Sequence, residues 1–248
     1  MPNQQYLLWH SSGWRVCYIS SGVYPDSLQM KIAMITPAAA NSRYGNRNTA
    51  VRWAQLLREL GHNVVVQERW NNRSVDALIA LHARRSHDSI ARYAERHPAR
   101  PLIVALTGTD LYRDIREDAN AQESMELATC MVVLQDMGLR ELALRLRRKT
   151  RVIYQSCDPI LRQPVIKSCF EIVISGHLRE EKDPFCGAAA LRYLPADSRI
   201  RITHIGGARE PALAREARRW MQQEPRYIWL DELTRSHALA TLARSRAM

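Results

Sequence analysis

Short apolar runs alternate along this chain with segments whose apolar residues recur at helical spacing. Runs this short and continuous are typical of strands buried on both faces of a parallel sheet. They lie at residues 31–36, 64–66, 75–81, 101–106, 130–134, 151–154, 169–175, 199–205 and 226–230. The alternation predicts an α/β protein with doubly wound parallel sheets.

Residues 31–61, KIAMITPAAANSRYGNRNTAVRWAQLLRELG, form the first complete unit of this pattern. A strand at 31–36 leads into a loop rich in Asn, Ser, Gly and Arg, which are residues of turns and helix starts. The helix that follows carries one apolar face and ends at Gly61, a residue suited to a helix C-cap. Such a unit presents free backbone N–H groups and the positive end of a helix to an anion.

A break in the pattern at residues 155–167 predicts a domain boundary. This segment holds Pro159 and Pro164 and few periodic apolar residues. We therefore expect two Rossmann-like domains, at residues 30–154 and 168–248, joined by this linker.

The first residues of the chain do not follow the alternation. Residues 1–29 have no sustained period, and Met30 directly precedes the first clear strand. We expect Met30 to be the natural start and residues 1–29 to be an unstructured extension.

Composition narrows the classes of function. The 248 residues carry a formal charge of +11, which suits nucleic acid or an anionic small molecule. The basic residues are dispersed, and no basic stretch is interleaved with aromatic residues as a nucleic-acid stacking platform requires. The charge therefore favours a small anionic ligand, and we expect no nucleic-acid partner.

No secretory signal and no apolar run approaching the roughly 20 residues of a membrane span is present in the sequence. The cysteines are odd in number and far apart, which favours reduced thiols and a cytoplasmic protein. They are Cys17, Cys130, Cys157, Cys169 and Cys186.

Several motif classes are absent from the sequence. There is no GxSxG, Walker A, HExxH or GxGxxG motif, which argues against hydrolases, NTPases, zinc proteases and Rossmann dehydrogenases. His82, His87 and His97 lie near one another in sequence, but no carboxylate or cysteine stands at metal-ligand spacing from them. We expect structural roles for these histidines and no metal site.

Two loops on the expected carboxyl edge of the first sheet carry polar candidates. The loop NSRYGNRN offers Gly45 for close backbone approach, with Arg43 and Arg47 for an anion, and the alternative is a solvated loop. The second loop is Thr107-Gly108-Thr109-Asp110, directly after a buried strand. Asp110 can orient a sugar hydroxyl or act as a base, or it can simply cap a helix.

The second domain opens with a sharper candidate. Gly176 ends a buried strand and is followed by His177, Arg179 and Lys182. Cations at this spacing can clamp a diphosphate leaving group, and the alternative is an exposed turn with salt-bridged charges. Gly206 and Gly207 after the next strand also allow close ligand approach, or form a plain turn.

Two α/β domains, with G-x-L-x-x-x-K opening the second, resemble the GT-B glycosyltransferases with a glycogen-synthase-like donor domain. Four blocks are similar to the selenosugar synthase family of selenoneine biosynthesis. They are MKIAMITPAAANSRYGNRNTAVRWAQLLRELGHNV, ALTGTDLYRDI, VISGHLREEKDPF and ITHIGGA. The resemblance covers residues 30–248.

The resemblance implies an enzyme that transfers a sugar from a UDP-sugar, such as UDP-N-acetylglucosamine, to selenophosphate. The products would be a 1-selenosugar and UDP, and no cofactor or metal is implied, since protein cations stabilise the diphosphate. Lys182 occupies the position of the family's diphosphate-binding lysine. His177 stands where an arginine is usual, and we expect Arg179 to replace that charge.

The resemblance also implies an acceptor side. Gly45 and its neighbours, Asn46 among them, would form the acceptor loop. We expect Arg43 and Arg47 to hold the phosphate of the acceptor, and Thr107, Gly108 and Thr109 to line the same cleft. Asp110 is the catalytic candidate.

Donor domains of this type continue through a further strand to an acidic E-x7-E-like motif, whereas this sequence stops at Met248. We expect an incomplete second domain with an open apolar edge and impaired activity. The alternatives are a non-catalytic nucleotide- or anion-binding protein, a GT-B enzyme with another acceptor, or a basic protein that binds nucleic acid or a partner.

Overall fold

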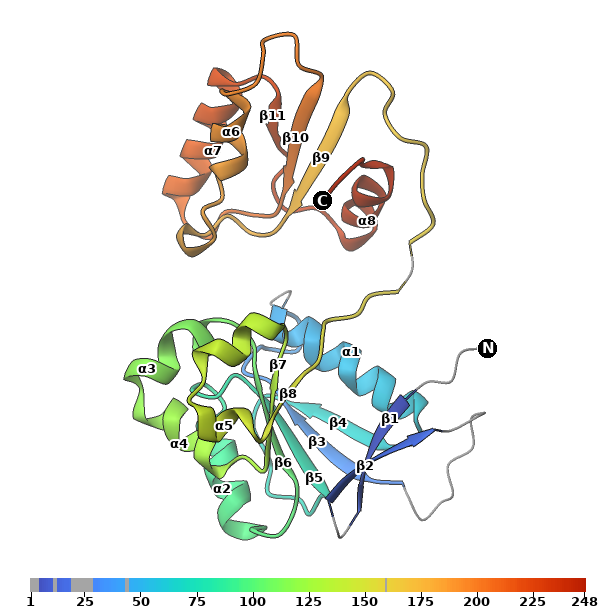
Figure 1. Cartoon of the computed structure of the whole chain (residues 1–248), viewed down its shortest axis with the longest axis vertical. Helices are drawn as coiled ribbons and strands as arrows, with labels where there is room; N and C mark the ends of the chain where they lie inside the picture. The colour runs from blue at the N-terminus through green and yellow to red at the C-terminus, as the bar shows by residue number, and fades with distance from the viewer. Residues whose placement is uncertain (1–4, 11–12, 19–28, 43–44, 159) are drawn as a thin grey trace. The chain divides into compact units, whose positions relative to one another are not determined.

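The computed structural model describes residues 5–10, 13–18, 29–42, 45–158 and 160–248. The chain divides into two compact units, Met1–Ser156 and Cys157–Met248 (Figure 1). The division falls within the predicted linker, 155–167, and each unit is built on a parallel sheet as the alternation predicts. Across the described ranges, every helix is too short or too polar to span a membrane.

The N-terminal unit contains a six-stranded parallel sheet with the order β4-β3-β5-β6-β7-β8. Its chain starts at β3, adds β4 on one side, and then crosses to the other side at β5. In sheets of this kind, ligands bind beyond the carboxyl ends of the strands at such a reversal. The strands are β3 (Lys31–Ile35), β4 (Asn63–Gln67), β5 (Ala77–Leu81), β6 (Leu102–Leu106), β7 (Cys130–Val133) and β8 (Thr150–Val152).

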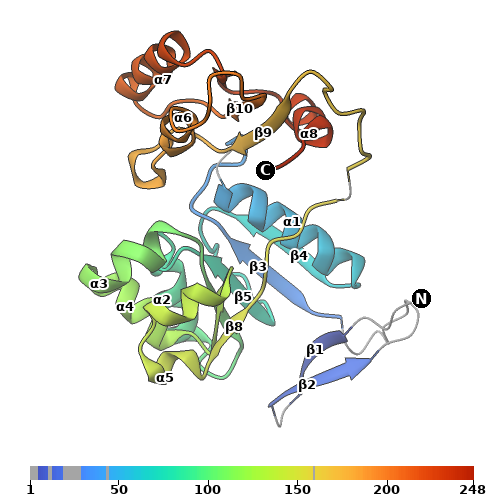
Figure 2. The same cartoon turned by 45° about the horizontal axis from the view of Figure 1, so that its top comes forward.

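Helices cover both faces of this sheet (Figure 2). One face is covered by α1 (Gly45–Glu59), and the other by α2 (His87–Arg96), α4 (Ala119–Leu127) and α5 (Leu144–Arg147). The connections also contain η2 (Asp110–Asp114), α3 (Ile115–Glu117) and η3 (Asp136–Glu141). This arrangement explains why the strands are apolar at successive positions.

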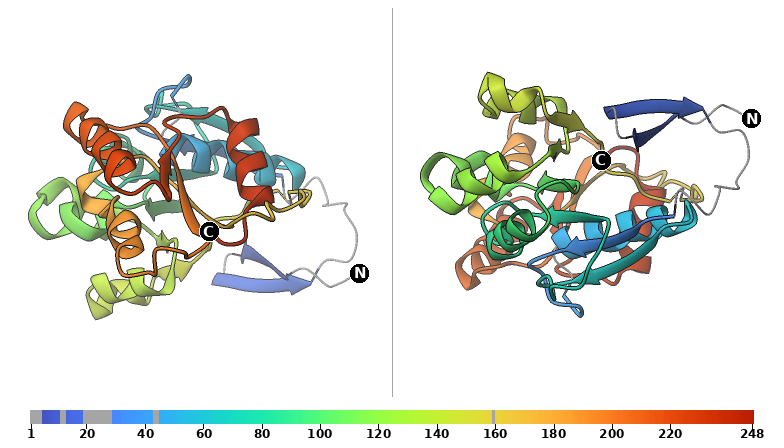
Figure 3. Two further views of the ribbon diagram at one scale, coloured as in Figure 1. Left: turned by 90° about the horizontal axis from the view of Figure 1, so that it is seen from above. Right: turned by 90° about the horizontal axis from the view of Figure 1, so that it is seen from below.

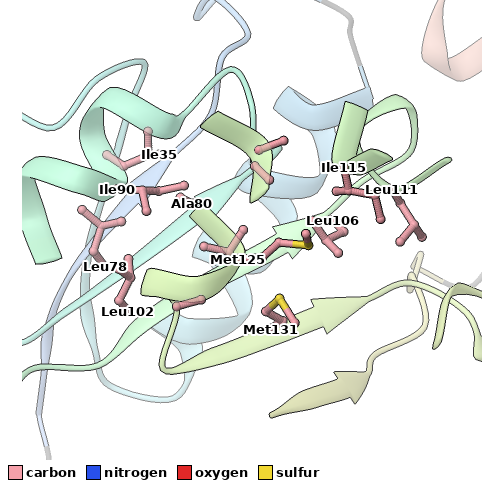
Figure 4. Packing of buried hydrophobic residues seen from close by; sticks show 14 of the residues in the cluster. Ile35, Leu78, Ala80, Ile90, Leu102, Leu106, Leu111, Ile115, Met125 and Met131 are labelled. Atoms are coloured by element: carbon pink, nitrogen blue, oxygen red, sulfur yellow. The ribbon is translucent and has the colours of Figure 1, made fainter. Parts of the chain in front are cut away.

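Alternate residues of each strand enter different cores. In β3, Ala33 and Ile35 pack with α2 and α4, whereas Ile32 and Met34 pack with α1. All four side chains are buried, and full burial of an aliphatic side chain contributes roughly 1.5–3 kcal/mol. Figure 4 shows the first of these cores, with labelled side chains from several strands meeting those of the helices.

The C-terminal unit contains a three-stranded parallel sheet with the order β11-β10-β9. Helices α6 and α7 pack on one face, and α8 lies on the other side of the strands (Figures 1 and 3). The strands are β9 (Phe170–Ser175), β10 (Ile200–Ile205) and β11 (Tyr227–Trp229). The helical segments are η4 (Glu180–Lys182), α6 (Cys186–Leu191), α7 (Pro211–Gln223) and α8 (Arg235–Arg244).

Residues beyond α8 pair with the free side of β9. The N–H of Arg246 donates to the Glu171 carbonyl at 2.8 Å, and the N–H of Val173 donates to the Ala247 carbonyl at 2.9 Å. Ala247 forms a parallel bridge with Ile172. The edge of β9 is therefore paired at this point, where the sequence analysis expects an open edge, and the order of strands reverses here as it does at β5.

A buried carboxylate holds α8 against this sheet. Glu171 is 1% exposed, and its Oε1 accepts hydrogen bonds from Thr203 Oγ1 at 2.8 Å and Arg201 Nη2 at 3.0 Å. Nε of Arg244, in the last turn of α8, lies 3.7 Å from Oε2. Two guanidinium groups thus compensate one buried negative charge, which would otherwise be costly to desolvate.

We expected residues 1–29 to be an unstructured extension, and this is wrong for two segments. β1 (Gln5–His10) and β2 (Gly13–Tyr18) pair as antiparallel strands. Both segments are rich in aromatic and aliphatic residues, which favour strands even without a long period. Residues 1–4, 11–12 and 19–28 lie outside the described residues.

Candidate functional site

The loops that follow β9 and β10 approach each other at glycine residues. Gly206 has φ +141°, and a Cβ atom built on it would lie 2.1 Å from the Gly176 carbonyl oxygen. The N–H of Gly176 donates to the Ile205 carbonyl at 2.8 Å, and the N–H of Leu178 donates to the Gly207 carbonyl at 3.1 Å. The predicted residues Gly176, Gly206 and Gly207 therefore lie together at the carboxyl edge of the second sheet, and only glycine fits at position 206.

Lys182 returns over this pair of loops. Its Nζ lies 3.6 Å from the point that a Cβ atom of Gly176 would occupy, because η4 turns the chain back toward the strand end. Lys182 is exposed. An exposed ammonium group beside backbone that carries no side chain is an arrangement that suits a phosphate oxygen.

The pKa of His177 is affected by two further cations at the same edge. Burial lowers the pKa of His177 first, and the positive charges of Arg209 and Arg179 lower it further. Glu232 and the backbone of Gly207 oppose this shift in pKa. The two arginines therefore lie near enough to contribute to a positive field, and Arg209 is a residue that sequence reasoning missed although it closely follows Gly207.

Two carboxylates lie beside Gly207. A Cβ atom at Gly207 would lie 3.4 Å from Glu232 Oε2 and 3.5 Å from Asp231 Oδ1. Asp231 has φ +57°, and its Oδ1 accepts a hydrogen bond from the Glu232 N–H at 2.8 Å. Carboxylates accept hydrogen bonds from hydroxyl groups, so Asp231 and Glu232 suit the hydroxyl groups of a sugar. Neither residue is among the candidates predicted from the sequence, although both directly follow a strand end.

Two buried side chains form hydrogen bonds with the carbonyl groups of the glycine loops. His204 Nε2 lies 3.1 Å from the Gly176 carbonyl oxygen, and Trp229 Nε1 donates to the Gly206 carbonyl at 2.8 Å. Burial lowers the pKa of His204, and the positive charge of Lys182 lowers it further, against opposing hydrogen bonds to the carbonyls of Gly176 and Pro184. The imidazole is therefore neutral at neutral pH.

At the carboxyl edge of the N-terminal sheet, Asp110 organises two loops. It is fully buried, and Oδ2 accepts a hydrogen bond from the Ala83 N–H at 3.0 Å. Oδ1 accepts hydrogen bonds from the N–H groups of Thr107 and Gly108, each at 2.9 Å. Because these bonds occupy the carboxylate and burial shields it, the geometry favours a positioning role for Asp110 over the predicted role as catalytic base.

Thr109 is tied to the same edge by His82. His82 is buried with φ +73°, and its Nδ1 accepts a hydrogen bond from the Arg85 N–H at 3.3 Å. In the neutral ring Nε2 then carries the proton and donates to Thr109 Oγ1 at 3.2 Å. Burial lowers the pKa of His82, against the opposing charges of Asp110 and Asp114.

The predicted acceptor loop is described only in part. Arg43 lies outside the described residues, whereas Gly45, Asn46 and Arg47 form the first turn of α1. A Cβ atom on Gly45 would meet no atom within 4 Å, so protein packing does not require glycine there.

The three histidines considered as metal ligands have separate partners. His87 Nδ1 lies 3.0 Å from Ser124 Oγ, and His97 packs against the rings of Trp70 and Tyr93. Within the described ranges, no group of three or more potential ligands could hold a metal ion.

Comparison with known proteins identifies the fold. No protein-family model matches the sequence, and no curated protein matches it. Among solved structures, Anabaena HepE in complex with UDP and glucose is similar, with 14% identity, a TM-score of 0.59, and 83% of this chain and 70% of that chain covered. The catalytic domain of Arabidopsis thaliana starch synthase IV, bound to ADP and acarbose, has 9% identity, a TM-score of 0.60, and 88% and 77% covered.

A third similar structure carries a different enzyme name. A putative UDP-N-acetylglucosamine 2-epimerase from Listeria monocytogenes has 10% identity, a TM-score of 0.52, and 88% of this chain and 72% of that chain covered. Together these likenesses confirm the predicted GT-B-type fold, with a six-stranded parallel sheet and a second, smaller sheet. At these identities they show the fold alone.

Replacing Gly206 tests the contact between the two glycine loops. In Gly206→Ala the new methyl group would meet the Gly176 carbonyl at 2.1 Å and would sit at φ +141°, so the loops must move apart. We expect a loss of roughly 2–4 kcal/mol in the free energy of unfolding. Urea unfolding followed by circular dichroism measures this loss. The control is Gly45→Ala, where the methyl group meets no atom within 4 Å, and equal effects of the two changes would contradict the argument.

The buried histidines predict a stability that depends on pH. The folded-state pKa values of His82 and His204 are lowered below the ordinary 6.5, so the unfolded chain binds protons more readily than the folded chain. Their contribution is complete above the unfolded pKa and is lost as the pH falls through the folded pKa. We expect stability to fall as the pH is lowered below about 7. Thermal melting should show a weaker dependence in His204→Gln, whereas a matched change at the exposed His237 should leave the dependence as it is in the parent.

Proposed function

We propose that this chain is a glycosyltransferase that takes a sugar from a UDP-sugar. The observation that carries the proposal is the convergence of Gly176, Gly206 and Lys182 at the carboxyl edge of a parallel sheet. The fold around this convergence resembles that of proteins crystallised with UDP, UDP-glucose or ADP. A nucleoside diphosphate presents the anionic group that this edge suits.

In this proposal, protein cations stabilise the departing UDP. Negative charge develops on the diphosphate as the bond to the anomeric carbon breaks. Lys182, with Arg179 and Arg209 nearby, supplies positive charge that is already in place before the reaction. Asp231 and Glu232, beside Gly207, accept hydrogen bonds from hydroxyl groups of the sugar or the ribose.

For the acceptor we propose selenophosphate, on the strength of the sequence resemblance. The selenium anion attacks the anomeric carbon, the C–O bond to the diphosphate breaks, and its electron pair leaves with UDP. The sugar then carries the phosphoryl group on selenium, and water cleaves the Se–P bond to give the 1-selenosugar and inorganic phosphate. Selenium anions are good nucleophiles that need little help from a base, which agrees with an Asp110 that is committed to backbone N–H groups. Arg47, in the first turn of α1, is the described cation we assign to the acceptor phosphate, together with Arg43.

Lys182→Ala tests the donor site. Loss of the ammonium group beside Gly176 removes a charge-assisted contact to the diphosphate, so we expect UDP to bind about 10- to 100-fold more weakly. Isothermal titration calorimetry of the full chain with UDP measures the affinity. The control is Lys167→Ala, which removes an exposed lysine of the linker segment. Equal UDP affinity in the Lys182 variant and the parent would contradict the assignment.

Turnover tests the acceptor. The full chain, incubated without oxygen with UDP-N-acetylglucosamine or UDP-glucose and selenophosphate, should release UDP, inorganic phosphate and a 1-selenosugar. Mass spectrometry detects UDP and the selenosugar, including the selenosugar that still carries the phosphoryl group on selenium. Arg47→Ala should raise the KM for selenophosphate by about tenfold and leave the KM for the UDP-sugar unchanged. The control is Arg148→Ala, exposed just before β8 at the opposite end of the sheet.

Three other outcomes would each contradict the selenophosphate proposal. Transfer to a different nucleophile would retain a glycosyltransferase with another acceptor. Epimerisation of UDP-N-acetylglucosamine would place the chain with the activity named for the Listeria protein. Binding of UDP without turnover of any UDP-sugar would leave a nucleotide-binding protein.

A further inference from the structure

Two buried rings hold the glycine loops, and the proposed reaction does not use either of them. His204 is 2% exposed and Trp229 is 7% exposed. His204 Nε2 lies 3.1 Å from the Gly176 carbonyl oxygen, and Trp229 Nε1 donates to the Gly206 carbonyl oxygen at 2.8 Å. The two glycines belong to loops that leave neighbouring strands, so the rings act on both sides of one edge of the sheet.

The direction of the hydrogen bonds at His204 follows from its partners. A carbonyl oxygen can only accept, so Nε2 carries the proton and donates to Gly176. Nδ1 then accepts a hydrogen bond from the Tyr227 hydroxyl at 3.1 Å. Tyr227 is fully buried, and burial raises its pKa, which keeps the proton on the hydroxyl. A chain of hydrogen bonds thus runs from Tyr227 through His204 to the Gly176 carbonyl.

Planarity of the peptide bond transmits this orientation to the following residue. In a trans peptide the N–H of a residue points opposite to the carbonyl group before it, and the described part of the chain contains no cis peptide bond. The N–H groups of His177 and Gly207 therefore point away from the two rings. In the described hydrogen bonds between backbone groups, neither of these N–H groups donates.

The peptides that follow Gly176 and Gly206 need hydrogen bonds to hold them in one orientation, because both residues are glycine. A peptide that follows glycine can rotate between orientations that other residues disfavour, because glycine lacks a Cβ atom. Position 206 must be glycine to avoid a clash with the Gly176 carbonyl. Glycine thus lets the two loops approach each other, but it also makes the backbone at this position less rigid. Hydrogen bonds from the rings to the carbonyl oxygens restore one orientation before a ligand arrives.

We propose that His204 and Trp229 are positioning residues of the donor site. Each fixes one glycine carbonyl inward, and so directs the next N–H, that of His177 or Gly207, toward the diphosphate beside Lys182. Tyr227 supports His204 in this role. The inference rests on the proposed function for the presence of a diphosphate, and it adds which backbone groups bind it and what orients them.

Nuclear magnetic resonance of the full chain tests the proposal amide by amide. The probes are inorganic pyrophosphate and UDP, added to ¹⁵N-labelled protein. We expect the amide signals of His177 and Gly207 to shift with either probe. Trp229→Phe keeps a ring and removes the N–H, and it should abolish the response of Gly207 while that of His177 persists. UDP should bind this variant about tenfold more weakly.

His204 provides the reciprocal comparison with its own rescue. His204→Phe removes both nitrogens and should abolish the response of His177, with UDP binding about tenfold weaker. His204→Gln places an amide N–H near the position of Nε2 and should restore both. Circular dichroism verifies that each variant is folded, and if His204→Phe does not fold, the Trp229→Phe comparison and the Gln rescue carry the test.

The outcomes separate this inference from the proposed function. UDP binding that depends on Lys182 without any shift of the His177 and Gly207 amides would overturn the positioning role alone. Unchanged UDP affinity in folded Trp229→Phe and His204→Phe would do the same. Shifts of both amides with pyrophosphate, in a chain that transfers no sugar, would support the positioning role and overturn the glycosyltransferase.

Discussion

The contact between Gly206 and the Gly176 peptide is the constraint on which the second unit's site depends. Two loops leave adjacent parallel strands at the same end, and they can touch only because position 206 lacks a side chain. The contact fixes where Lys182 stands on the outer side and which carbonyls the buried rings meet on the inner side. Cationic groups, glycine backbone and ring donors therefore form one arrangement rather than separate features.

The N-terminal unit also joins two loops at the carboxyl edge of its sheet, but the side chain that joins them accepts hydrogen bonds instead of donating them. Asp110 joins the loops after β5 and β6, but as a carboxylate it accepts hydrogen bonds from N–H groups. The N–H groups of Thr107 and Gly108 are thereby used, and this edge offers mainly side-chain hydroxyls. In the C-terminal unit, ring donors engage the carbonyls instead, and in the positioning role that we propose the following N–H groups bind the ligand. This difference supports our assignment of the anion to the loops after β9 and β10.

Much of the fold could be predicted from the sequence because burial on both faces demands continuous apolar runs, as at β6, where every residue of Leu102–Leu106 is apolar. The glycines and Lys182 could be chosen because they directly follow such a run. His204 and Trp229 could not, since a buried ring within a strand looks like core until its partner carbonyl, in a distant loop, is known. Asp110 left three interpretations open because one of its three N–H partners, Ala83, lies far away in sequence.

The cluster of Glu171, Arg201 and Arg244 limits which substitutions this sequence can accept during evolution. Loss of either arginine would leave a buried carboxylate undercompensated, and loss of Glu171 would leave like charges facing each other. Three apolar residues of similar volume could replace the cluster together, whereas each single step toward them is unfavourable. These positions on β9, β10 and α8 should therefore substitute as a set among descendants of this chain, so that α8 and its sheet are inherited as one piece.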